Sequence, residues 1–333
     1  MTTETLSLKA IEQLAFDALT AVGTTPDNAR YLAQATADTE ADGVASHGLA
    51  YIPIYCEHVQ CGKVDGAAQV RVSQPRPATV VVDAANGFAH PAIEAGFDAL
   101  IQAARDNGIA VLSIKNSYNC GVLGVHTQKI ARTGMLGLGF TNAPASIAPS
   151  GGARPVVGTN PISMATPDGQ GGVSILIDQS ASVIAKSEIM KHNREGKAIP
   201  LGWALDAQGN PTTDPAEGLK GSMAPSGDYK GVGIGLIVEV LAAALSGSNL
   251  GTQASPFSGT AGGPPGTGQC FIAIDPGCAS EHSAARLATL VESILVQKGA
   301  RLPGRNRGAK RAAAQQNGVA VSQATLDKIR ALI

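Results

Sequence analysis

The chain contains few charged residues, few aromatic residues and no apolar run long enough to span a bilayer. Asp, Glu, Lys and Arg make up 15% of its 333 residues and Phe, Trp and Tyr only 4%, against about 25% charged residues in typical globular proteins. The formal net charge is -1 and no basic stripe is present, so nucleic acid is not an expected partner. The best apolar run, VGIGLIVEVLAAAL, carries Glu239 and is too short for a membrane span. No membrane partner is therefore expected.

The sequence also shows no targeting signal and no closely paired cysteines. The N-terminal stretch MTTETLSLKAIEQLAFDAL is amphipathic and acidic, without the basic start and apolar core of a signal peptide. The five cysteines are odd in number and form no CxxC pair, so disulfides and structural zinc are not expected. We expect a soluble, cytoplasmic protein without a metal site.

Apolar residues are plentiful, at 44%, and they predict three helices in the first 60 residues. The first begins at Ser7 and ends at Gly23, because serine caps helices and glycine ends them. The second begins at Thr25, which is followed by proline at the first helical position, and runs to about Asp42. The third covers 47–59 and bends at its proline.

After residue 75 the pattern alternates between strands and helices, which is typical of an α/β domain. Strands are expected at 78–83, 109–117, 136–142, 162–167, 174–180 and 270–276. Helices are expected at 90–106, near 124–134, at 181–193, at 230–247 with burial on most sides, and near the end at 283–299 and 322–333. The Gly/Pro-rich segment 251–269 is expected to be a surface loop. The simplest organisation is a helical domain built from both chain ends around a central α/β domain.

His47, in the stretch DGVASHGL, is the candidate proton donor. One reading is a histidine that caps or packs a helix start. The other is a general acid, because histidine titrates near neutral pH and can donate and recover a proton. Ser46 could orient or relay that proton, and Gly43 and Gly48 would allow a ligand close to the backbone. No second histidine lies four residues away, which argues against a metal site.

Two βα connections could contact a cofactor. In IKNSYNCGVLGVH, Gly121 and Gly124 open a helix whose free N–H groups could hold an anion, although an ordinary connection has the same form. In SILIDQSAS, Asp178 lies at the end of a strand, where it could cap the next helix or accept hydrogen bonds from a ribose. Glu188, on that helix, would by default be a solvated surface residue.

Two basic segments could contact a phosphate or a carboxylate. Lys230 begins an apolar helix, where the helix dipole already favours an anion. The stretch RLPGRNR carries three arginines in a loop, which could clamp a cofactor phosphate or only solubilise the surface. These residues alone do not identify a reaction.

Seven segments in fixed order resemble one known family across about residues 5–310. They are DGVASHGL, NSYNCGVLG, GTNPISMATP, LIDQSAS, IPLGWALDAQGNPTTDP, GDYKGVGIGLIVEVLAAALSG and RLPGRNR. This set resembles the malate/L-lactate dehydrogenase type 2 family, which includes sulfolactate and ureidoglycolate dehydrogenases and reductases of Δ1-piperideine-2-carboxylate and Δ1-pyrroline-2-carboxylate. The resemblance implies a non-Rossmann α/β domain that holds NAD(P)H, at 76–279, a helical domain at 1–75 with 280–333, and a homodimer.

The resemblance also implies roles for individual residues. Ser46 and His47 would be the relay and the proton donor, and Glu188 matches an acidic relay position of imine-reducing members. Tyr51 and Asn160 would contact the substrate. The cofactor would be contacted by Asn119, Cys120, Gly121, Val122, Leu123, Asp178, Gln179, Ser180, Lys230, Arg301, Arg305 and Arg307.

Two departures from the family pattern bear on the substrate. Several members have a histidine in place of Asn119 and use it as an acid/base in hydroxy-acid oxidation, whereas asparagine cannot titrate. Members also often have an arginine in place of Tyr51, and that arginine can pair with a substrate carboxylate. Both departures favour a C=N substrate, whereas the stretch GTAGGPPGTGQCFIAIDP is most similar to the sulfolactate dehydrogenase branch.

We therefore predict an NAD(P)H-dependent reductase that transfers hydride to C2 of a small cyclic imine carboxylate, Δ1-pyrroline-2-carboxylate or Δ1-piperideine-2-carboxylate. The alternative is an NAD(P)-dependent 2-hydroxy acid dehydrogenase of sulfolactate, malate or lactate type. A cofactor-binding protein without catalysis is a third reading, supported only by the missing histidine at Asn119. The arginines of 301–307 favour NADP over NAD.

Overall fold

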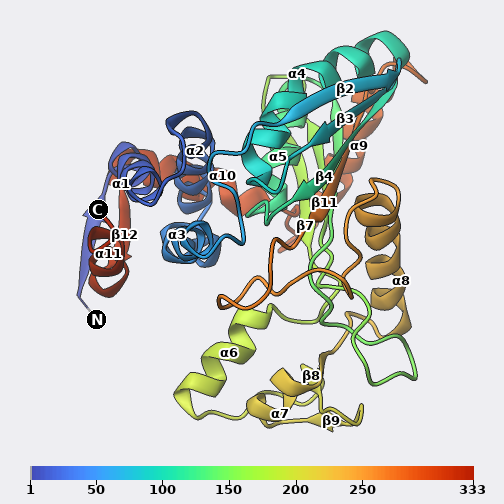
Figure 1. Ribbon diagram of the computed structural model, residues 1–333. Coiled ribbons are helices and arrows are strands. Elements are labelled where there is room, and N and C mark those ends of the chain that lie inside the picture. The colour runs from blue at the N-terminus through green and yellow to red at the C-terminus, as the bar shows by residue number, and fades with distance from the viewer. Residues whose placement is uncertain (1) are drawn as a thin grey trace.

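A seven-stranded sheet forms the centre of the molecule in the computed structural model, which describes residues 2–333 (Figure 1). Its strand order is β2-β3-β4-β11-β5-β6-β7. The strands are β2 (Arg71–Arg76), β3 (Thr79–Asp83), β4 (Ile109–Ser117), β5 (Leu136–Thr141), β6 (Ile162–Pro167), β7 (Val173–Gln179) and β11 (Thr267–Ile274). Only the β3–β4 pair is parallel. A Rossmann sheet is mostly parallel, so the predicted non-Rossmann α/β fold is confirmed.

The single parallel pair is joined by the predicted βαβ crossover. Helix α4 (Ala89–Asn107) connects β3 to β4 and ends at Gly108, which has a left-handed φ of 79°. Its buried face packs with both strands in one apolar cluster that includes Val82, Phe97 and Leu112. The six expected strands are all present, although β11 begins at Thr267 and so takes the last residues of the expected 251–269 loop.

The two chain ends meet in a helical lobe beside the sheet. It contains α1 (Leu8–Ala21), α2 (Pro26–Ala41), α3 (Ile52–Gln60) and α11 (Gln323–Arg330), and the short strands β1 (Thr3–Leu6) and β12 (Val319–Ser322) pair antiparallel. Ser7 caps α1 as expected, because its side chain accepts a hydrogen bond from the Ala10 amide. Figure 1 shows both termini at this lobe. The helical ends lie together as the sequence suggested, and the exact domain boundaries stay a prediction.

A small third unit was not predicted. Helix α6 (Lys186–Glu195) starts five residues after the expected position 181, and the polar stretch behind it contains α7 (Pro215–Lys220). Three two-residue strands, β8 (Ala204–Leu205), β9 (Pro211–Thr212) and β10 (Ser222–Met223), form a sheet of order β10-β8-β9. This unit lies below the main sheet in Figure 1.

The apolar helix expected at 230–247 is exposed along one side, so the prediction of burial on most sides is wrong within this chain. It comprises α8 (Tyr229–Val238) and a π-helical segment, η3 (Glu239–Ala244). The exposed fractions of Leu236, Ile237 and Val240 are 48%, 54% and 57%. Among residues 2–333, no helix combines the length and the apolarity that a transmembrane segment requires.

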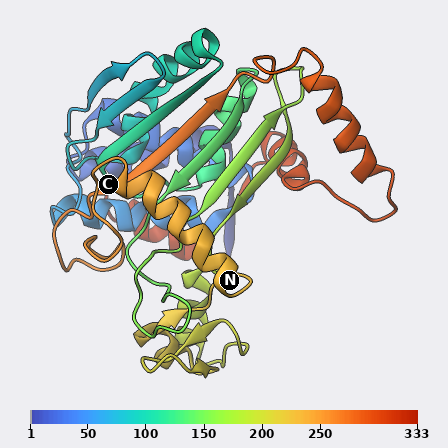
Figure 2. The ribbon, with the colours of Figure 1, turned by 90° about the vertical axis from the view of Figure 1, so that its right-hand side faces the viewer.

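The C-terminal third of the chain contains a helix that the sequence did not indicate. The expected helix at 283–299 is α9 (Ser283–Leu295), which has no buried residue and projects from the body in Figure 2. The unpredicted α10 (Arg305–Asn317) follows, so the 301–307 segment is a short loop that continues into a helix. Helix α10 packs against α2 and β7.

Candidate active site

His47 lies at the junction between the helical lobe and the sheet. The expected helix at 47–59 is divided into two 3₁₀ turns, η1 (Ala45–His47) and η2 (Leu49–Tyr51), followed by α3. The imidazole stacks on the Tyr51 ring, with centroids 5.8 Å apart and planes 2° from parallel. The Ser46 hydroxyl oxygen lies 3.0 Å from Nδ1 of His47. The predicted pair therefore has the geometry in which serine orients the imidazole.

A buried carboxylate holds this turn in place. Glu40 of α2 accepts a hydrogen bond of 2.8 Å from the Leu49 amide, and burial raises the pKa of its carboxyl group. A Cβ atom at Gly48 would lie 2.2 Å from Oε1 of Glu40. Glycine is thus required at 48 by close packing against Glu40, in addition to any approach of a ligand.

The predicted cofactor loop, residues 119–123, is held by the side chain of its first residue. Oδ1 of Asn119 accepts hydrogen bonds from the Gly121 amide at 2.7 Å and from the Tyr55 hydroxyl at 3.4 Å. Gly121 has a φ of 67°, which glycine adopts without strain. Helix α5 (Leu123–Arg132) starts directly after this turn. The Asn119 side chain therefore stabilises the loop as a hydrogen-bond acceptor. It cannot exchange a proton as a histidine at this position could.

Two further histidines, which no sequence motif indicated, lie under the same loop. A recess of about 10 Å³, the size of a single water-sized sphere, is lined by His47, Tyr55, His90, His126 and residues 120–122, among others. Nε2 of His126 lies 2.9 Å from the Cys120 carbonyl oxygen, to which it donates. Nδ1 of His90 is buried and has no hydrogen-bond partner in the described chain.

The three histidines of the recess differ in exposure, and burial lowers the pKa of each. Burial lowers the pKa of His90 to about 3 and also lowers that of His126, so both are neutral at neutral pH. Burial lowers the pKa of His47 as well, but the negative charge of Asp178 opposes that change. His47 is partly exposed, whereas His90 and His126 are buried, so His47 is the histidine of this recess that can exchange a proton with a ligand.

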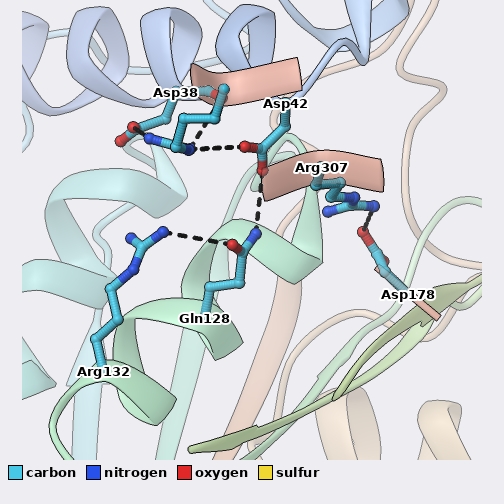
Figure 3. Close-up of polar contacts among 7 residues, drawn as sticks. Asp38, Asp42, Gln128, Arg132, Asp178 and Arg307 are labelled. Atoms are coloured by element: carbon cyan, nitrogen blue, oxygen red, sulfur yellow. Dashed lines mark hydrogen bonds and ion pairs between the residues drawn. The ribbon is translucent and has the colours of Figure 1, made fainter. Parts of the chain in front are cut away.

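A separate groove of about 350 Å³ runs along the end of β7, lined by Leu176, Ile177, Asp178, Gln179, Pro303, Gly304 and Arg307. Nη2 of Arg307 lies 2.9 Å from Oδ2 of Asp178, and both side chains are largely buried (Figure 3). The structure thus brings two predicted cofactor segments, distant in the sequence, to one groove. A carboxylate can bind ribose hydroxyls and a guanidinium can bind phosphate.

Helix α10, which carries Arg307, is fixed to α2 by ion pairs one turn further on. Arg311 donates to Asp38 at 2.6 Å and to Asp42 at 2.9 Å. Asp42 also accepts a hydrogen bond of 3.1 Å from Gln128 of α5 (Figure 3). These contacts join α2, α5 and α10, and they set the position of Arg307 beside the sheet.

Six predicted site residues lie elsewhere in the described chain, and one of them, Ser180, has its hydroxyl group bonded to Ser182. Glu188 is 42% exposed at its side chain and lies 3.8 Å from Lys191, with no contact to Ser46 or His47 among residues 2–333. Asn160 is fully buried, and its side chain bonds Ala143, Gly235 and Glu239. The remaining three are exposed at the surface: Lys230, Arg301 and Arg305. Asn160 thus has the contacts of a structural residue and does not line either cavity.

The sequence contained one usable signal for the residues that were missed. His47, Tyr51 and Tyr55 are four residues apart, a spacing that places side chains on one helical face. Tyr55 could have been included in the site for that reason. His90, His126 and Glu40 come from three other helices, and no local pattern joins them to His47.

Comparison with known proteins connects this geometry to one family. The sequence profile described as malate/L-lactate dehydrogenase matches residues 6–330. A (2R)-3-sulfolactate dehydrogenase (NADP(+)) of Chromohalobacter salexigens is 41% identical over 326 residues, which are 98% of this chain and 97% of the relative. A Delta(1)-pyrroline-2-carboxylate reductase of Ancylobacter novellus is 36% identical over 331 residues, 98% of this chain and 97% of the relative.

Solved structures give the same picture of the fold. The delta1-piperideine-2-carboxylate reductase of Pseudomonas syringae pv. tomato superposes with a TM-score of 0.93 at 35% identity, covering 99% of this chain and 100% of that chain. The sulfolactate dehydrogenase of Methanocaldococcus jannaschii superposes with a TM-score of 0.88 at 26% identity, covering 99% and 96%. Relatives named for C=N reduction and for hydroxy-acid chemistry thus share one fold with this chain.

Proposed function

The chain belongs to the malate/L-lactate dehydrogenase family of oxidoreductases, and from this premise we propose that it reduces the C2 carbon of a small 2-substituted carboxylate with NAD(P)H. The observation that carries the proposal is the position of His47. It is oriented by Ser46 and lies at a recess formed by the 119–123 loop. The preferred substrate is Δ1-pyrroline-2-carboxylate or Δ1-piperideine-2-carboxylate.

The groove at the end of β7 fits the cofactor. Asp178 would accept hydrogen bonds from ribose hydroxyls. Arg307, whose Nη1 is buried without a partner in the described chain, would donate to a phosphate, and this supports NADP over NAD. Gly304 and Leu176 line this groove together. A Cβ at Gly304 would lie 2.5 Å from Cβ of Leu176, so only glycine allows the backbone at 304 to lie this close to β7. When bound, the reduced nicotinamide supplies the hydride.

His47 would deliver the proton that accompanies the hydride. Its Nδ1 is engaged by Ser46, so Nε2 is the atom left to face a substrate. The recess admits only a water-sized group, and the substrate would lie outside it, on the exposed side of Ser46. Glu188 stays a prediction from the resemblance, because its carboxylate lies beside Lys191 in this chain.

The residues around His47 support an imine over a keto group. Asn119 is used as a hydrogen-bond acceptor by Gly121 and Tyr55, so this site lacks the second acid/base of hydroxy-acid oxidation. An imine nitrogen is more basic than a keto oxygen and accepts a proton more readily from one histidine. Tyr51 offers a ring face and a hydroxyl to the substrate.

A second candidate is oxidation or reduction at C2 of a 2-hydroxy or 2-oxo acid of sulfolactate type. It is supported by the greater identity, 41%, to the relative named for sulfolactate. It is also consistent with the lowered pKa of His47, because a neutral imidazole can accept the hydroxyl proton during oxidation.

One experiment separates the two candidates. NADPH and NADH oxidation would be followed at 340 nm with each cyclic imine, with 3-sulfopyruvate and with oxaloacetate, and reduction of NADP(+) and NAD(+) with the corresponding hydroxy acids. Turnover of the imines at least tenfold faster than of any oxo acid supports the first candidate. Turnover of an oxo acid without turnover of either imine contradicts it and supports the second.

We also propose a homodimer, as the resemblance implies. The exposed apolar side of α8 and η3, with Leu236, Ile237 and Val240 about half exposed, is a surface that association would cover. Light scattering coupled to size exclusion measures this directly, and a mass of one chain would contradict it. The cytoplasmic location stays a prediction.

A further inference from the structure

Helix α10 contacts both parts of the candidate site although it has almost no apolar packing of its own. It contains no apolar side chain larger than alanine, and only Ala314 in it is buried. Arg307 and Arg311 are four residues apart and therefore lie on one face of the helix. Their side chains are only 20% and 22% exposed. The contacts that hold this helix are therefore chiefly those of its charged side chains.

At Arg307 the helix contacts the cofactor groove. Nη2 of Arg307 lies 2.9 Å from Oδ2 of Asp178, and both residues line the groove. Just before the helix, the Pro303 carbonyl oxygen accepts a hydrogen bond of 3.2 Å from the Leu176 amide of β7. Nη1 of Arg307 is buried and has no partner among residues 2–333, so it is a donor that a cofactor phosphate could take.

At Arg311, one turn further on, the same helix contacts the end of α2. Nε of Arg311 donates to Oδ1 of Asp42 at 2.9 Å, and its Nη1 donates to Oδ1 of Asp38 at 2.6 Å. The Asp42 side chain is 1% exposed, and its other oxygen accepts a hydrogen bond from Gln128 of α5 (Figure 3). Arg311 is thus the cation that neutralises a buried carboxylate at this end of α2.

The end of α2 leads directly into the η1 turn, which carries the proposed proton donor. Asp42 is the C-cap of α2, and η1 (Ala45–His47) begins three residues later. Between them, a Cβ at Gly43 would lie 2.6 Å from Cδ of Lys310, so α10 also packs against the connecting backbone. One short helix therefore contacts the cofactor groove and the base of the η1 turn.

We propose that α10 sets the spacing between the cofactor groove and His47 and that Arg311 is a positioning residue of the reaction, an inference that rests on the proposed function. Four residues of helix fix about 6 Å along its axis, so Arg307 and Arg311 hold the groove and α2 in one register. The hydride and the proton reach the same substrate, and their transfer requires that spacing. Without Arg311, both Arg307 and the η1 turn lose their support.

Hydrogen exchange in the ligand-free protein is the first test, with Arg311→Gln as the variant and Arg330→Gln as the matched control. Arg330 of α11 also joins two elements, by an ion pair of 3.0 Å with Glu4, and it lines neither cavity. Exchange within 305–317 and 43–51 should become at least about tenfold faster in Arg311→Gln, since a buried carboxylate loses its cation. Arg330→Gln should leave both segments unchanged.

Cofactor binding and turnover give the second readout. By calorimetry, the Kd of NADP(+) should rise more in Arg311→Gln than the Kd of NAD(+), which has no 2′-phosphate for Arg307 to bind. With saturating NADPH and the imine or oxo acid that the wild type turns over, kcat should fall about tenfold, because a 1 Å misplacement can cost about 100-fold. A residue that only stabilised the fold would lower the melting temperature and leave kcat and the ratio of the two Kd values unchanged.

Two more variants decide the matter if Arg311→Gln folds poorly. Arg311→Lys keeps a cation but not the planar fork that binds two carboxylates at once, so it should recover part of the lost kcat. Asp38→Asn should change kcat and the Kd ratio in the same direction by a smaller factor. Folded Arg311→Gln or Asp38→Asn with wild-type kcat and Kd ratio overturns the inference alone. If the wild type binds neither cofactor, the proposed function itself fails.

Discussion

The hydroxyl oxygen of Ser46 lies 3.0 Å from Nδ1 of His47. Because Nδ1 is engaged, the opposite nitrogen, Nε2, is free to exchange a proton with a ligand. The imidazole also stacks on the Tyr51 ring, with planes 2° from parallel, and this contact restricts rotation of the His47 side chain. Ser46 and Tyr51 together fix the direction of the proton donor, which is what general acid catalysis requires.

Replacing His47 should abolish most of the reaction while cofactor binding persists. His47→Ala is expected to lower kcat by about 10²–10⁴-fold, the range for loss of a general acid. The groove at Asp178 and Arg307 lies on other elements, so the Kd for NADP(+) should change little. Steady-state assays and calorimetry measure the two quantities. Ser46→Ala, which removes only the orienting bond, should lower kcat less.

The pH dependence of the reduction should follow the protonation of His47. Burial lowers its pKa below the ordinary 6.5 in the ligand-free protein, so the protonated acid is lost as the pH rises through that value. The rate of reduction, as kcat/KM, should therefore fall on the alkaline side of a pKa below 6.5. Oxidation in the reverse direction needs the neutral form and should rise over the same range. A reduction rate that does not vary between pH 5 and 8 would contradict the role of His47.

Gly124 should be required for cofactor binding although alanine is the better helix former. Alanine in a helix gains up to about 1 kcal/mol over glycine, yet its Cβ would lie 2.6 Å from Oδ2 of Asp178. Gly124→Ala is expected to raise the KM for NADPH about tenfold, equivalent to 1.4 kcal/mol, by displacing Asp178 and Arg307. Gly233→Ala is the matched control, because its Cβ meets no atom within 4 Å and should keep the KM. Equal KM values for NADPH in the two variants would contradict the proposal that the cofactor binds in the groove at Asp178 and Arg307.

His90 should make the protein sensitive to acid. Its pKa is lowered by burial to about 3, whereas in the unfolded chain it takes up a proton near the ordinary 6.5. The unfolded state therefore binds more protons between these values, and stability is lost as the pH falls from 6.5 toward 3. The contribution of one histidine is about 1.4 kcal/mol per pH unit. Denaturant unfolding of His90→Gln and wild type at pH 7 and pH 5 tests this, and the variant should lose less stability.

Local sequence patterns predicted the elements whose own residues form them. The strands at 109–117 and 162–167 are found with those bounds, and Ser7 caps its helix as its position indicated. Helix α10 escaped because only Ala314 in it is buried, so its sequence has no apolar periodicity. The exposed side of α8 was predicted wrongly because an apolar sequence does not show which of its side chains the rest of the chain covers.

The candidate site could be predicted only in part from the sequence, for a different reason. Ser46 and His47 are adjacent, and the 119–123 turn carries its own hydrogen bond through Asn119, so both could be found locally or by resemblance. The pairing of Asp178 with Arg307 spans 129 residues. His90 reaches the recess from a third element. Such contacts depend on the packing of the sheet and lobes, which no short stretch encodes.

Lys63 should hold the Gly/Pro-rich loop against the site. It is 1% exposed, and its Nζ donates to the carbonyl oxygens of Gly259 and Ala261 at 3.1 and 2.8 Å. The loop places Phe257 on Tyr118, with ring centroids 5.4 Å apart, next to Asn119. Lys63→Met removes the buried ammonium that donates to these loop carbonyls and is expected to reduce the free energy of unfolding by about 2 kcal/mol and to increase proteolysis within 255–263. The exposed Lys9→Met is the matched control and should change neither; an unchanged unfolding midpoint in Lys63→Met would show that the loop is held without its ammonium group.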